Sequence, residues 1–171
     1  MMASLKKFIK KIIGRQEVSR LDELKKRGLK VGANFHMFGE VIIDGGHCHL
    51  IEIGDNVTLA PRAYILAHDA STFVYLGYSK VRKVSIGNNV FIGAGSIIMP
   101  GVSIGNDVIV GAGSIVTKDV PNNTVVAGNP TKPIHRTEKY IASQKLKMTS
   151  TNTFGRAYQL ANNPTEAMKA E

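Results

Sequence analysis

Between Val84 and Val120 the hydrophobic positions recur every six residues. The recurring aliphatic residues are Ile86, Ile92, Ile98, Ile104, Val110 and Val116. Two places before each following member stands a small or β-branched residue: Val90, Ser96, Val102, Val108 and Ser114. This period matches neither the turn of an α-helix nor the alternation of an ordinary strand. We therefore predict that each unit is a very short strand plus a turn, and that three units make one triangular coil.

The aliphatic residue of each unit is expected to point inward and to stack on its equivalent in the next coil. Successive coils then rise by the spacing of paired strands, about 4.8 Å. Tight corners require positive φ angles or close backbone approach, conditions that glycine and asparagine tolerate best. Such residues do follow the aliphatic positions, at Gly87, Asn88, Asn89, Gly105 and Asn106.

The same step is present earlier in the chain, with two interruptions. The first coil is predicted to contain Val31, Met37 and Ile43, and the second to contain Ile53, Leu59 and Ile65. Between them, residues 45–50 are additional and are expected to form a small protrusion. After Ile65 the pattern stops again, and residues 69–83 are expected to leave the solenoid as a loop.

Helical segments are predicted on both sides of the solenoid. Residues 4–13 carry apolar residues on one helical face and lysines on the other. A second short helix should begin at Ser19 as its N-cap and end at Gly28. A C-terminal helix is expected over residues 138–148, followed by a polar tail. The predicted segments are thus 1–30 (helical), 31–136 (solenoid) and 137–171 (helix and tail).

Composition limits the functional classes. The chain has 171 residues, of which 43% are hydrophobic, which suits one domain with a slender core. A single cysteine, Cys48, excludes an internal disulfide and favours a reducing compartment, so we expect a cytoplasmic protein. The net charge is +9, and residues 1–30 hold ten Lys or Arg against three acidic residues, a net +7. The repeats lack a basic face with aromatic residues, which argues against nucleic-acid binding.

Two segments carry a resemblance to a known family. They are IGNNVFIGAGSIIMPGVSIGNDVIVGAGSIVTKDVP and VVAGNPTKPI. Both resemble the hexapeptide-repeat acetyltransferases. The resemblance implies an all-β solenoid, a left-handed parallel β-helix, which general crossover rules would not favour. It also implies acetyl-CoA as acyl donor, no metal, and a homotrimer with its active sites between subunits.

His68 lies where the second coil gives way to the predicted loop, the position of the catalytic histidine in this family. The chemistry needs a base there, because an acceptor hydroxyl is a poor nucleophile at neutral pH. The pair His68–Asp69 resembles the polysaccharide- and lipopolysaccharide-modifying O-acetyltransferases. A surface histidine at the base of a loop is the structural alternative.

For the cofactor, the resemblance implies backbone contacts at Ala94 and Ala112, then Thr117 and Lys118. Lys132 and Arg136 are candidates for its phosphates. Pantetheine is a thin chain that needs a groove with small side chains, and Gly93-Ala94-Gly95-Ser96 and Gly111-Ala112-Gly113-Ser114 could supply one. The alternatives are ordinary corner residues for the alanines and a solvated lysine for Lys118.

The acceptor pocket differs from that of simpler sugar acetyltransferases in the family. These carry an asparagine in the first coil that residues 35–40 do not offer. Polar replacements are sought among Asn34, His36, Glu40 and Asp44. His47 and His49 fall in the extra protrusion and are expected to be exposed to solvent.

The sequence argues against several other functions. A zinc-dependent branch of the fold uses two histidines five positions apart, and the five histidines of this chain contain no such pair. About 30 residues before the solenoid leave no room for a nucleotide-binding domain. The favoured function is acetyl transfer to a sugar hydroxyl, in a surface polysaccharide or lipopolysaccharide precursor. N-acetylation of an amino sugar and a non-catalytic scaffold remain open.

The helix over residues 4–13 has two interpretations. Its apolar face packs on the solenoid or on a neighbouring subunit, with the lysines solvated. Alternatively, this face lies on the inner leaflet of a membrane, where each lysine near anionic lipid contributes roughly 1 kcal/mol. The second interpretation would bring the enzyme to a lipid-linked acceptor.

Overall fold

The structure, a computed structural model, describes residues 20–149. It divides into two compact units, one that extends to Thr137 and one that begins at Glu138. The predicted amphipathic helix over residues 4–13, with its proposed membrane contact, and residues 150–171 of the tail lie outside the described residues. Among residues 20–149, no helix has the length and apolar character needed to cross a membrane.

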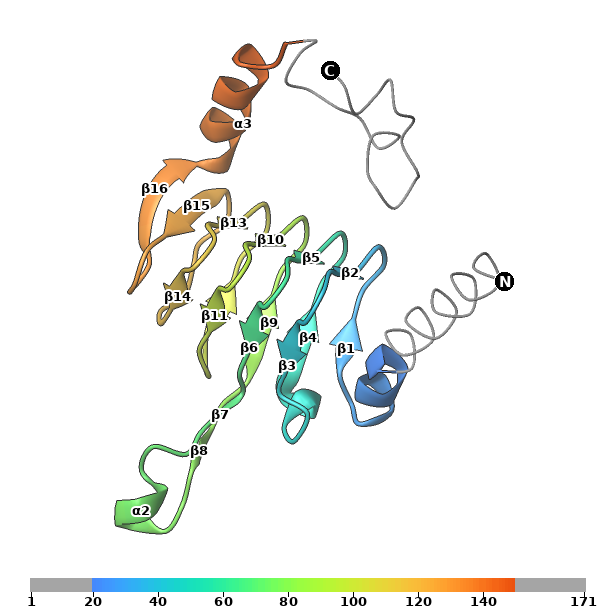
Figure 1. Cartoon of the computed structure of the whole chain (residues 1–171), viewed down its shortest axis with the longest axis vertical. Helices are drawn as coiled ribbons and strands as arrows, with labels where there is room; N and C mark the ends of the chain where they lie inside the picture. The colour runs from blue at the N-terminus through green and yellow to red at the C-terminus, as the bar shows by residue number, and fades with distance from the viewer. Residues whose placement is uncertain (1–19, 150–171) are drawn as a thin grey trace, which may run out of the picture. The chain divides into compact units, whose positions relative to one another are not determined.

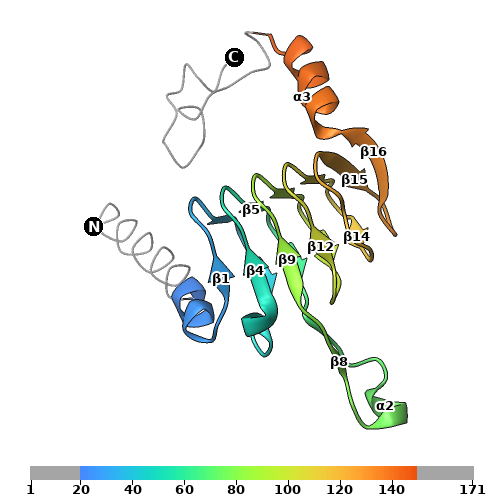
Figure 2. The ribbon, with the colours of Figure 1, turned by 180° about the vertical axis from the view of Figure 1, so that it is seen from behind.

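The first unit is a solenoid with three walls, each a parallel sheet (Figures 1 and 2). The first sheet contains β1 (Lys30–Val31), β4 (Ile51–Ile53), β9 (Val84–Ile86) and β12 (Ser103–Ile104). The second contains β2 (His36–Met37), β5 (Thr58–Leu59), β10 (Phe91–Ile92), β13 (Ile109–Val110) and β15 (Thr124–Ala127). The third contains β3 (Ile42–Ile43), β6 (Tyr64–Ile65), β11 (Ile97–Ile98) and β14 (Ile115–Val116). The chain visits the sheets in this order, so every circuit of three strands is one coil.

We number the corners by the sheets they connect. The first corner joins the first sheet to the second, the second corner joins the second to the third, and the third corner returns to the first sheet. After β15, strand β16 (Lys132–Arg136) turns back and pairs antiparallel with it.

The predicted inward column is confirmed. Each of the six repeating aliphatics is at most 4% exposed, and equivalent residues are paired across coils, as Ile92 is with Val110 and Leu59. The small residues at the corners are equally buried, and Ser96 and Ser114 are fully so. The period of six therefore arises from one inward aliphatic and one tight corner in each wall.

At the first corner the predicted positive φ is found at Asn89, whereas Asn88 and Asn106 instead accept backbone hydrogen bonds with their side-chain oxygens. Positive φ angles of 53° to 57° occur at Asn34, Asn56, Asn89, Asp107 and Asn123. Successive residues of this column are linked by hydrogen bonds of 2.9–3.0 Å. The side-chain amide of Asn34 donates to Asn56, that of Asn56 to Asn89, and that of Asn89 to Asp107. Glycine precedes this corner because the coils approach closely: a Cβ on Gly87 would lie 2.8 Å from the backbone of Gly105.

Both interruptions emerge at the third corner. The first contains a short 3₁₀ helix, η1 (Cys48–Leu50). The second, predicted as a loop over residues 69–83, is structured, which corrects that prediction. Strands β7 (His68–Asp69) and β8 (Lys80–Val81) pair antiparallel and carry the short helix α2 (Phe73–Leu76). We call residues 68–83 the arm, which projects away from the coils in Figure 1.

The helices that precede and follow the solenoid in the sequence agree with the sequence pattern within the described range. Residues 20–26 are helical, Leu24 packs into the core, and the helix ends before Gly28, whose φ is 103°. The thiol of Cys48 donates to the carbonyl of Leu24 over 3.6 Å, which links η1 to this helix. In the second unit, α3 (Thr137–Leu146) occupies most of the predicted C-terminal helix.

Candidate active site

The stacking of the coils brings Asp44 close to His68. Ile43 in β3 is paired with Ile65 in β6, so the residues that follow these strands lie side by side at the third corner. Asp44 comes directly after β3, and His68 begins the arm. Oδ2 of Asp44 lies 2.5 Å from Nδ1 of His68. The predicted base therefore has a carboxylate partner from the preceding coil.

Asp44 is held on both of its oxygens. Oδ2 also accepts a hydrogen bond from the backbone N–H of Ala67 at 3.1 Å, and Oδ1 accepts one from the N–H of His47 at 3.2 Å. Its side chain is 3% exposed, whereas that of His68 is 41% exposed. One edge of the imidazole thus meets a buried carboxylate while part of the ring remains accessible.

Asp44 is a carboxylate at neutral pH. Burial alone would raise its pKa, but the hydrogen bonds from His68, Ala67 and His47 outweigh burial and hold the pKa below the ordinary value. A charged carboxylate can only accept hydrogen bonds, so Nδ1 of His68 carries the hydrogen between them. Nε2 is then left with a lone pair, as a base requires.

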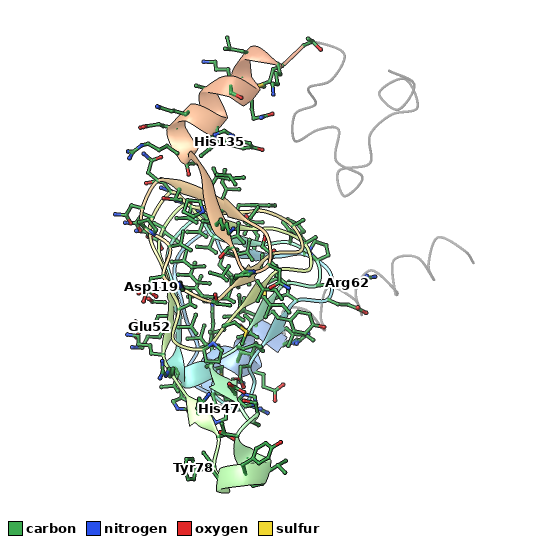
Figure 3. The ribbon with its side chains drawn as sticks, turned by 90° about the vertical axis from the view of Figure 1, so that its left-hand side faces the viewer. His47, Glu52, Arg62, Tyr78, Asp119 and His135 are labelled. Carbon is green, nitrogen blue, oxygen red and sulfur yellow. The ribbon has the colours of Figure 1, made fainter. Side chains whose placement is uncertain are left out.

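His47 is part of this cluster, although sequence reasoning placed it in solvent. Its side chain is only 34% exposed. Its Nδ1 atom is buried and lies 3.5 Å from Oδ1 of Asp44. Its ring centroid lies 4.9 Å from that of His68, with 36° between the planes. Figure 3 shows His47 near the base of the arm that bears Tyr78. His49 is exposed, as predicted.

The cluster does not have the arrangement of a resident metal centre. Asp44, His47 and His68 each offer one ligand atom, and these atoms lie within 4.8 Å of one another. However, Oδ2 of Asp44 and Nδ1 of His68 already bind each other, and a metal ion could take both only if that hydrogen bond broke. The three side chains are therefore better arranged for proton transfer than for metal coordination.

The residues proposed for the cofactor fall at two different corners. Thr117 and Lys118 follow β14 at the third corner, in the same column as His68. Ala94 and Ala112 precede β11 and β14 at the second corner, on the opposite edge of the third sheet. All four are exposed. A single chain therefore does not gather the whole predicted set at one edge.

The small residues of the second corner have structural roles of their own. A Cβ on Gly93 would lie 2.5 Å from the backbone nitrogen of Ala112, so coil stacking alone demands glycine there. The Ser96 hydroxyl donates to the carbonyl of Gly111 at 2.9 Å. Ala94 and Ala112 are exposed residues, and the carbonyl of Ala94 already accepts a hydrogen bond from the N–H of Gly113 at 2.8 Å.

The remaining predicted positions are spread over the solenoid. Lys132 and Arg136 are exposed at the two ends of β16. Asn34 belongs to the amide column at the first corner, His36 stacks on Phe38, and Glu40 is exposed at the second corner. Of the four candidates for holding the acceptor, only Asp44 adjoins His68, and its oxygens are already occupied.

The arm also brings a cation to the third corner that sequence reasoning did not single out. The side chain of Arg82 lies against Gly101: a Cβ added to this glycine would be 2.9 Å from Cδ of Arg82. The backbone N–H of Arg82 donates to the carbonyl of Ala67, next to His68. Only the antiparallel pairing of the arm, which the repeat pattern does not encode, could have indicated this placement.

A shallow hollow of about 480 Å³ lies elsewhere, on the first sheet, and its lining includes Glu52 and Ser85. Hydrogen bonds from Lys30 and Lys83 lower the pKa of Glu52 to about 2. None of the predicted site residues lines this hollow. Its residues belong to the first sheet and its corner, so we do not assign the chemistry to it.

Comparisons with known proteins agree with the solenoid. A family model described as hexapeptide repeat of succinyl-transferase matches residues 83–118. Protein CapG of Staphylococcus aureus is 43% identical over 124 residues, which cover 70% of this chain and 72% of that protein. The sequence of CapG thus matches the solenoid well beyond the regular repeats.

Two solved structures are similar to the chain. A maltose O-acetyltransferase from Clostridium difficile 630 matches with a TM-score of 0.57 and 43% identity, covering 64% of this chain and 59% of that one. A hexapeptide-repeat acetyltransferase from Vibrio cholerae, solved with acetyl coenzyme A, gives a TM-score of 0.58 and 27% identity, covering 64% and 60%. The chain spans about three fifths of each structure. Together with the match to CapG, these findings show that the chain belongs to the hexapeptide-repeat acetyltransferase family.

Proposed function

We propose that this protein transfers an acetyl group from acetyl-CoA to a sugar hydroxyl, on a left-handed β-helix, with His68 as the general base. The observation that carries the proposal is the hydrogen bond from Nδ1 of His68 to the buried Asp44, which leaves Nε2 free to accept a proton. The similarity to a maltose O-acetyltransferase supports the acceptor class, and the acetyl-CoA complex of a relative supports the donor.

In the proposed reaction, Nε2 of His68 takes the proton of the acceptor hydroxyl while the oxygen attacks the thioester carbonyl carbon. The tetrahedral intermediate collapses, the carbon–sulfur bond breaks, and the CoA thiolate leaves. The imidazolium returns its proton to that thiolate. Acetyl passes directly to the sugar, and a positioned base of this kind contributes typically 10² to 10⁴-fold.

Asp44 is a positioning residue in this scheme. Its carboxylate fixes the ring orientation and the tautomer of His68, and it stabilises the imidazolium that forms during attack. The backbone donors Ala67 and His47 hold the carboxylate itself in place. Asp69 is not the partner of His68, since its carboxylate accepts from the N–H of Ser71 and lies 3.6 Å from Lys80.

A second copy of the chain would complete the site, and we propose the homotrimer expected from the family. His68, Thr117 and Lys118 stand at the third corner, whereas Ala94 and Ala112 stand at the second. In a threefold assembly the third corner of one copy faces the second corner of the next. A heterologous contact of this kind closes into a ring. It would also cover the open side of the pantetheine groove.

Exposed apolar residues support such a contact. On the arm, Phe73, Val74, Tyr75, Leu76 and Tyr78 are 54–88% exposed. A second set of exposed apolar residues, 37–54% exposed, consists of Phe38 and Ile42 in the first coil and Phe91 in the third. Exposed apolar patches are typical of interaction sites. We assign the second set as the surface that receives the arm of the neighbouring copy.

The function is tested by following CoA thiol release from acetyl-CoA against a panel of monosaccharides, amino sugars and lipid-linked glycans. The proposal expects acceptor-dependent release and an acetyl ester on a hydroxyl, identified by mass spectrometry and by its loss in mild base. An amide product stable to base would instead establish N-acetylation. Acetyl-CoA binding without turnover on any acceptor would contradict the assigned chemistry.

A further inference from the structure

One buried group near the site has no role in the mechanism described above. Nδ1 of His47 is buried and has no hydrogen-bond partner among the described residues. It faces Oδ1 of Asp44 at 3.5 Å, on the opposite oxygen from the one that binds His68. Two imidazoles therefore flank one carboxylate and pack against each other at 4.9 Å.

The orientation of His47 follows from the charge of Asp44. A lone pair on Nδ1 would face the lone pairs of the carboxylate, which is unfavourable, so a hydrogen at Nδ1 is required. The ring then presents an N–H to Asp44 whether it is neutral or an imidazolium. The His47 backbone N–H binds the same oxygen at 3.2 Å, so backbone and side chain converge on Asp44.

We propose that His47 is a positioning residue that holds the ring of His68. The proposal rests on packing: the His68 ring is hydrogen-bonded to Asp44 and packs at 4.9 Å, tilted by 36°, against the ring of His47. This inference presupposes that His68 is the base. It adds a residue to which nothing in the repeat pattern assigns a role.

The test uses the full-length protein and three variants. His47→Phe keeps a ring to pack on His68 but removes the ionisable nitrogens, and His47→Ala removes both. His49→Ala is the matched control, since His49 is a neighbouring histidine in the same insertion but is exposed. For each, kcat and KM for acetyl-CoA are measured from pH 5 to 9, and long-range ¹H–¹⁵N spectra follow the imidazoles during titration.

We expect His47→Ala to lower kcat by roughly 10 to 100-fold with KM for acetyl-CoA unchanged, because His68 is present but less well oriented. His47→Phe should recover most of this loss, because it keeps a ring that packs on His68. His49→Ala should match the wild type. The spectra should show His68 with its hydrogen on Nδ1 in the wild type and in His47→Phe.

A wild-type profile in both His47 variants would overturn the inference. So would a His47→Phe variant as impaired as His47→Ala, because a ring at this position would then not be what orients His68. If His47→Ala fails to fold by circular dichroism, His47→Phe and the spectra still decide. Full activity in a His68→Ala variant would refute the proposed base itself, and this outcome is distinct from a failure confined to His47.

Discussion

The late coils and the early coils of the solenoid follow one stacking rule but differ in regularity. At the first corner, the residues linked by side-chain amides are 22 positions apart between Asn34 and Asn56 and 33 apart between Asn56 and Asn89. Between Asn89 and Asp107 the separation is 18, the length of three uninterrupted units. The hydrogen bonds are equally short in all three steps, 2.9–3.0 Å.

This difference shows that the insertions leave the scaffold in register. Both insertions emerge at the third corner, and the walls above and below them pair as in the regular coils. The inserted residues bring His47 and the arm to the site and place His68 beside Asp44. The regular coils supply the exposed small residues proposed for acetyl-CoA. The proposed base therefore lies where the repeat is broken, and the proposed donor groove lies where it is kept.

The largest effect is expected when the proposed base is removed from the irregular region. We expect His68→Ala to lower kcat by on the order of 10² to 10⁴-fold, as loss of a general base should. Acetyl-CoA affinity should change little and the fold should be retained, because the ring is partly exposed and lies outside the inward column; the melting temperature should fall slightly, since buried Asp44 loses one hydrogen bond. Kinetics, calorimetric titration and thermal melting check this, and near-normal turnover would be incompatible with the assignment.

A core substitution in the regular coils should instead lower stability and leave kcat nearly unchanged. Ile98 is fully buried in the inward column, and its neighbours in the stack are Ile65 and Val116. Ile98→Ala should reduce the free energy of unfolding by about 2–5 kcal/mol through lost burial and a residual cavity. The kcat of the folded fraction should remain near normal. Urea denaturation measures the first effect, and a selective loss of kcat without destabilisation would contradict this division.

The smallest expected effect is the pH dependence of stability from Asp44. Folding lowers the pKa of the Asp44 carboxyl below its ordinary value of 3.8. Its contribution to the free energy of unfolding is therefore complete above pH 3.8 and is lost as the pH falls through the lower pKa of the folded state. The wild type should therefore melt above Asp44→Asn at pH 6, and the difference should shrink on acidification below about pH 4. A difference that grows over that interval would show that the charged form is not the favoured one.

The sequence predicted the periodic part of the molecule well. Corners and inward residues depend on neighbours within six positions and on repeats of the same unit, so Asn89 and Ile98 could be assigned from the pattern. The same approach correctly placed His68 at the point where the repeat breaks. These features share a local physical cause: the short strand, the tight corner and the close approach of stacked coils.

The contacts of His68 could not be predicted in the same way. Asp44 was considered only as a residue that might hold the acceptor, because its pairing with His68 crosses an insertion and depends on the register of β3 with β6. His47 was expected in solvent, because nothing periodic fixes the path of the inserted residues. The arm was predicted as a loop, since its strands β7 and β8 are only two residues each.

The central claim is that the irregular region provides the base while the regular coils hold the donor. In the proposed trimer these belong to adjacent copies, which subunit mixing tests directly. His68→Ala removes the base, and Ala112→Trp fills the groove at the exposed second corner. Each variant alone should be nearly inactive. In a refolded equal mixture, half the copies retain each feature, so about a quarter of the sites should combine both and recover about a quarter of the activity. No recovery, in mixtures shown to contain both variants within one assembly, would contradict this account.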